Sequence, residues 1–62
     1  MIYSITYDVV INEELETLTS TVNSSGLIST TDSAKALLYQ HIYLDGEVVE
    51  TIHSYKRIDR TK

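Results

Sequence analysis

The sequence predicts an α+β fold: a three-stranded antiparallel or mixed sheet with one helix packed on one face, in the order β-β-α-β. Three observations predict it. Residues 2–11 alternate between large apolar and polar side chains, residues 14–22 can pair with them in one register, and residues 34–42 carry an apolar stripe with helical spacing. The alternative order β-α-β-β applies if residues 14–22 form a helix.

Residues 2–11 form the strand around which the sheet is expected to be built. Ser4, Thr6 and Asp8 lie between large side chains, and that period of two marks a strand with one buried face. The segment is rich in β-branched and aromatic residues and contains no Gly or Pro. The apolar positions are Tyr3, Ile5, Tyr7, Val9 and Ile11.

Residues 14–22 have two interpretations. As a helix, Leu15, Leu18 and Val22 would share a face, with Asn12 as the N-cap. As a strand, the segment returns from a turn at residues 12–13, so that Leu18 lies opposite Tyr7. That register leaves one face mostly apolar and the other a Ser/Thr ladder, and a slip of one residue would mix the two sets. We predict the hairpin, with either a two-residue or a four-residue loop.

A connector and a helix are expected next. Residues 23–26 have turn composition, and Leu27 and Ile28 are expected to pack onto the core. Residues 29–33 are all of the types that cap helix N-termini, and Gly46 stands where a glycine could end the helix. The competing interpretation is a strand over residues 38–44 that turns at Asp45-Gly46. The helix stripe consists of Ala34, Leu37, Leu38, His41 and Ile42.

Residues 47–58 form the last predicted strand. Their apolar positions do not keep one parity, which indicates an edge strand with a bulge or a face used by a second subunit. Residues 59–62 are expected to fray. The crossover rule makes the second and third strands parallel, with the first between them.

Length and composition limit the protein's class. The 62 residues make a single domain with net charge −4 and no cysteine, which excludes a disulfide framework and a thiolate metal site. No membrane span and no signal peptide are expected, and a cytoplasmic location is predicted. A domain this small without staples is expected to be a homodimer, formed through the last strand or through Tyr39 and Tyr43.

The sequence contains no catalytic, cofactor or metal motif. His41 and His53 could pair with Asp8 or Glu50, but metal-binding spacings such as HxH or HExxH are absent. The only two glycines, at positions 26 and 46, make no phosphate-binding loop. We therefore expect a protein that is not an enzyme and holds no cofactor.

Residues 3–9 resemble the opening strand of small CRISPR-associated nucleases, which begin with an aromatic-rich strand ending in a metal-binding Asp. Asp8 stands in the matching place. The ferredoxin-like fold of those nucleases needs a second helix and a fourth strand, which a chain of 62 residues scarcely holds. The resemblance therefore implies no activity here.

Charge is distributed unevenly along the chain. No Lys or Arg precedes Lys35, and the predicted topology gathers carboxylates at one pole and basic residues at the other. We predict a non-enzymatic module that binds a basic protein surface, similar in layout and size to small phage or mobile-element inhibitors; the alternative is a nucleic-acid-associated regulator. The predicted protein-binding residues are Glu13, Glu14, Glu16, Tyr43, Asp45 and Glu47, and those of the alternative are Lys56, Arg57, Arg60 and Lys62.

Overall fold

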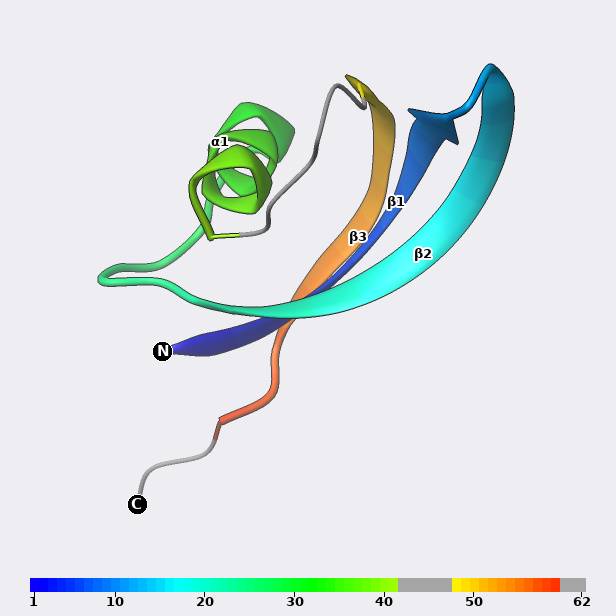
Figure 1. Cartoon of the computed structure of the whole chain (residues 1–62). Coiled ribbons are helices and arrows are strands. Elements are labelled where there is room, and N and C mark those ends of the chain that lie inside the picture. The colour runs from blue at the N-terminus through cyan, green and yellow to red at the C-terminus, as the bar shows by residue number, and fades with distance from the viewer. Residues whose placement is uncertain (42–47, 60–62) are drawn as a thin grey trace.

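The computed structural model describes residues 1–41 and 48–59 (Figure 1). It contains a three-stranded antiparallel sheet with one helix packed against it, so the predicted α+β fold and its β-β-α-β order are confirmed. The strands lie in the order β2-β1-β3. The elements are β1 (Ile2–Ile11), β2 (Glu14–Asn23), α1 (Thr31–His41) and β3 (Val48–Arg57).

The first two strands form a regular hairpin. Asn12 and Glu13 both have left-handed backbones, with φ of 52° and 66°, which is the conformation of a two-residue type I′ turn. Pairing runs without a slip from Ile11↔Glu14 to Ile2↔Asn23. The predicted register, including Leu18 opposite Tyr7, is therefore confirmed, and the helical interpretation of residues 14–22 is wrong.

The third strand is the irregular edge of the sheet. β3 pairs antiparallel with β1, and the register shifts twice, so that Glu50 and His53 are extra residues without a partner on β1. The bulge predicted from the broken parity of this segment is confirmed. Because β2 and β3 are both antiparallel to β1, they run in the same direction, as predicted.

The core lies between α1 and the face of the sheet formed by odd-numbered β1 residues. Thr30 caps the helix, because its hydroxyl oxygen accepts a hydrogen bond from the backbone N–H of Ser33 at 3.1 Å. Ala34 and Leu38 are fully buried, whereas Leu37 is half-buried. The remaining buried apolar side chains are Tyr3, Ile5, Tyr7, Val9, Val22, Ile28 and Val49.

The prediction that His41 belongs to the buried stripe is wrong. Burial follows the line from Ala34 to Leu38, and His41 is exposed at the end of α1. The last turn borders an open groove that is lined also by Asn23 and Ser25. Ile42, Asp45 and Gly46 lie outside the described residues.

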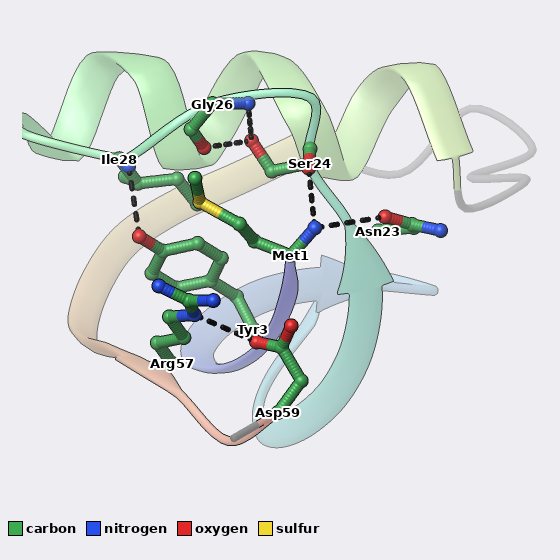
Figure 2. A network of polar contacts seen from close by, with 8 residues as sticks. All are labelled: Met1, Tyr3, Asn23, Ser24, Gly26, Ile28, Arg57 and Asp59. Carbon is green, nitrogen blue, oxygen red and sulfur yellow. Dashed lines mark hydrogen bonds and ion pairs between the residues drawn. The ribbon is translucent and has the colours of Figure 1, made fainter. Parts of the chain in front are cut away.

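Hydrogen bonds tie the loop between β2 and α1 to the start of β1 (Figure 2). The Met1 ammonium donates to the Ser24 carbonyl oxygen at 2.9 Å. Inside the core, the Tyr3 hydroxyl accepts a hydrogen bond from the backbone N–H of Ile28 at 3.1 Å. Ile28 is accordingly buried as predicted, whereas the same prediction is wrong for Leu27, which is 71% exposed.

Candidate functional site: the acidic hairpin end

Three glutamates lie at the β1–β2 turn. Glu13 is in the turn, Glu14 begins β2, and Glu16 pairs with Val9 two residues further along. All three are exposed, as is every β2 residue from Glu14 to Thr19. Figure 1 shows why: the turn extends away from α1, which does not cover this part of the hairpin.

Exposed apolar side chains lie at the same hairpin end, on the opposite face of the sheet from Glu14 and Glu16. Val10 pairs with Leu15 on one side and with Val48 on the other, which makes an apolar row across the sheet face opposite α1. Leu15 is 62% exposed and Val48 is 50% exposed. We call the three glutamates together with this row the acidic hairpin end: Glu13, Glu14, Glu16, Val10, Leu15 and Val48.

The other predicted protein-binding residues, Tyr43, Asp45 and Glu47, lie outside the described residues. Tyr39, the other tyrosine expected at a dimer interface, lies on α1. Its hydroxyl oxygen accepts a hydrogen bond from the backbone N–H of Val49 at 2.8 Å, although the residue is 45% exposed. Tyr39 therefore leans over the sheet and links α1 to β3.

The predicted basic residues lie at the opposite end of the sheet. Lys56 pairs with Ser4 and Arg57 pairs with Tyr3, whereas the glutamates surround the far end of β1. A ten-residue strand separates the two ends by roughly 30 Å. Arg60 and Lys62 lie outside the described residues.

Arg57 is engaged by a neighbouring carboxylate. Its Nε atom lies 2.8 Å from Oδ1 of Asp59, which lies in the stretch (residues 59–62) expected to fray. This hydrogen bond, with a second from the backbone of Ile2, lowers the pKa of Asp59 to about 2. Asp59 in turn raises the pKa of Arg57.

The Asp59 contact predicts an acid-sensitive end of the sheet. Because the folded-state pKa is below that of the unfolded chain, the contact stabilises the fold fully above pH 4 and is lost as the pH falls toward 2. We expect NMR titration of the Asp59 carboxyl group to give a midpoint near 2, and Arg57→Gln to move it toward the ordinary value of 3.8. A wild-type midpoint near 3.8 would contradict the contact.

A second polar cluster lies in the middle of the face opposite α1. His53 Nε2 is 2.9 Å from Asp8 Oδ1, and the Thr17 hydroxyl donates to the same oxygen at 2.5 Å. The Thr17 and then the His53 contact lower the pKa of Asp8. Within residues 1–41 and 48–59, no group of three or more His, Cys, Asp and Glu side chains could hold a metal ion.

The groove beside the end of α1 offers little chemistry. It has a volume of about 460 Å³ and is lined by Asn23, Ser25, Leu37, Gln40 and His41. Among the described residues that line it, His41 is the single titratable side chain, and no second such group is there to share a proton with it.

Comparisons with known proteins leave the geometry as the basis for a functional argument. No family model, no curated protein and no solved structure matches this chain. Among the described residues, the one helix, α1, is too short and too polar to cross a membrane.

Proposed function

We propose that the protein is a non-enzymatic module that binds another protein by placing its acidic hairpin end on a basic surface. One observation carries the proposal: three exposed glutamates lie at a hairpin end that α1 leaves uncovered, and the opposite sheet face of the same end exposes Leu15 and Val48. Charge and apolar area therefore lie at the same end of the sheet, on its two faces.

The two kinds of side chain have different roles in this proposal. Carboxylates gathered at one end speed the encounter with a cationic surface and can imitate a run of phosphates. Exposed charges alone contribute little affinity, so an apolar anchor must be desolvated beside them. Among the described residues, Leu15 and Val48 supply that anchor. The large side chain predicted from the sequence for this binding site is Tyr43.

The backbone of Glu13 also supports the proposal. Its φ of 66° places a residue with a side chain where glycine is preferred. The left-handed conformation costs such a residue roughly 1–2 kcal/mol. Backbone strain of this kind concentrates at functional sites, and a glutamate in place of glycine at this turn position is consistent with a binding role.

The biological class follows from the same features. A small acidic binding module of this layout suits a phage or mobile-element accessory or inhibitor protein, and a chain without cysteine suits the cytoplasm. Nucleic-acid binding is the weaker alternative. Arg57 is already paired with Asp59, and affinity for nucleic acid depends on the number of phosphates that are neutralised.

The test is a quantitative pull-down in which the charge change is matched. Glu13→Gln/Glu14→Gln removes the acidic turn, and Ser29→Lys/Ala36→Lys, at exposed positions outside the sheet, is the control. Both changes take the net charge from −4 to −2. We expect the first variant to lose a protein partner that the wild type and the control retain, with a loss of about tenfold or more at low salt.

Glu13→Gly separates binding from stability. Glycine relieves the left-handed backbone, so this variant should be more stable than the wild type by about 0.5–1 kcal/mol and should still bind the partner more weakly. Equal retention of the same partner by wild type and both acidic-end variants would refute the proposal. Retention of nucleic acid that is lost in Lys56→Ala/Arg57→Ala would favour the alternative instead.

A further inference from the structure

The two edges of the sheet differ in regularity. β2 is a ten-residue edge strand whose pairing with β1 is unbroken, whereas β3 is interrupted by bulges at Glu50 and His53. Bulges hinder the addition of a further strand, and a long regular edge favours it. Within the described part of the chain, the sheet ends at β2 and no strand covers its outer side.

The hydrogen-bond pattern shows which backbone groups of β2 face outward. The Ser24 N–H donates to the Met1 carbonyl oxygen at 2.7 Å, which continues the β1–β2 ladder by one pair. Because bonded and non-bonded pairs alternate in an antiparallel ladder, the even-numbered β2 residues bond to β1. The outward N–H and C=O groups therefore belong to odd-numbered residues: Leu15, Thr17, Thr19 and Thr21.

We propose that β2 pairs antiparallel with β2 of a second copy of this chain, about a two-fold axis at Leu18, to form a continuous six-stranded sheet. A two-fold axis normal to the sheet places the α1 faces of the two copies on the same side of the joined sheet. The residues whose N–H and C=O groups point outward must then pair with one another. Thr17 then bonds to Thr19 of the copy, and Leu18 lies opposite its own copy.

The side chains of β2 are complementary to themselves in this register. Its charged residues, Glu14 and Glu16, both lie near its start, so the antiparallel copy places Val22 and Ser20 opposite them. The two Glu16 side chains stay about 13 Å apart along the strands. Leu18, which is 37% exposed in one chain, meets its copy on the axis and is covered.

This pairing differs from the interface expected from the sequence, which used the last strand or Tyr39 and Tyr43. The proposed binding site borders this interface: Glu14, Leu15 and Glu16 lie opposite residues of the copy, their side chains stay on the two faces of the joined sheet, and Glu13 lies in the turn outside β2. The two acidic hairpin ends would point in opposite directions along the joined sheet, so one dimer could engage two basic surfaces. The dimer does not depend on the proposed function, and its test uses the purified chain alone.

Cysteine cross-linking tests the register, because the chain has no cysteine of its own. Leu18 faces its copy in a non-hydrogen-bonded pair, where Cα atoms lie about 4.5 Å apart, within reach of a disulfide. We expect Leu18→Cys to give a covalent dimer under mild oxidation. Leu15→Cys, which would lie opposite Thr21, should remain a monomer on a denaturing gel, as should Thr51→Cys on the β3 side.

A charge swap at the same position gives a second test. Leu18→Lys and Leu18→Glu should each be monomeric by light scattering, because each places two like charges on the axis, and their equimolar mixture should restore the dimer. Circular dichroism should show that each variant keeps its sheet. A monomeric wild type at millimolar concentration, a mixture that stays monomeric, or cross-linking at Thr51→Cys in place of Leu18→Cys would overturn the proposal.

Discussion

Leu38→Ala is expected to lower the free energy of unfolding by about 2–5 kcal/mol. The Leu38 side chain is fully buried among β1 and β3 residues, and its loss would leave a cavity that the short helix cannot close. A 62-residue domain has a total stability of only about 3–9 kcal/mol. The variant should therefore be largely unfolded under conditions where the wild type is folded.

Leu37→Ala is the matched control for this prediction. Leu37→Ala removes the same atoms from the neighbouring position of α1. The Leu37 side chain, however, is only half-buried at the edge of the core. Urea denaturation followed by circular dichroism should place the midpoint of Leu37→Ala between those of the wild type and Leu38→Ala. Equal losses in the two variants would show that the helix packs through a different face.

Tyr3→Phe is expected to cost about 1–3 kcal/mol, although it removes a single oxygen atom. That oxygen accepts the hydrogen bond from the backbone N–H of Ile28, and both residues are buried. Without it, a buried N–H group loses its partner, and the loop between β2 and α1 loses one of the hydrogen bonds that attach it to the start of β1. Hydrogen exchange should show the Ile28 amide opening faster than amides in the middle of β1.

Tyr7→Phe provides the comparison. The Tyr7 hydroxyl lies 2.8 Å from the Ser20 hydroxyl in a half-buried position, and Ser20 can turn to water when the partner is removed. We expect a loss of about 0.5–1.5 kcal/mol. A loss in Tyr7→Phe as large as that in Tyr3→Phe would mean that the Ile28 contact is not the source of the effect.

The hairpin could be predicted from the sequence because two independent patterns agree in it. The alternation in residues 2–11 shows which side chains of the first strand face the core. Pairing across residues 12–13 then places Leu18 and Val22 on that same face of the sheet. Leu18 shows the limit of such reasoning. Its face of the sheet is the one that α1 covers, yet the hairpin extends past the helix and leaves the residue 37% exposed.

Burial in the helix was harder to predict, because helical spacing defines a stripe without saying how much of it meets the sheet. Ala34 and Leu38 are one turn apart and fully buried, whereas His41, three residues further on, is exposed. The sheet covers a narrow band of α1. Sequence spacing does not show where along α1 the contact with the sheet ends.

The sequence did not show which histidine would contact which carboxylate, so the Asp8–His53 contact could not be predicted. The two histidines and nearby acids could be named, but His53 meets Asp8 from a bulge, and a bulge breaks the parity on which strand predictions depend. The three glutamates of the acidic hairpin end were easier to predict, because Glu13 lies in the predicted turn and Glu14 and Glu16 come directly after it. The exposed apolar row at the same end requires Val10 to pair with both Leu15 and Val48. The pairing with Val48 follows from the two register shifts in β3, which the sequence does not specify.

The position of β1 in the sheet has a consequence during synthesis. The central strand is made first, and its second neighbour, β3, begins only at Val48. At translation rates of about 5–20 residues per second, roughly 2–7 s pass between the completion of β1 and the arrival of the first β3 residue. A hairpin of β1 and β2 can close within microseconds. Throughout that interval, the edge of β1 that β3 will occupy lacks this partner strand.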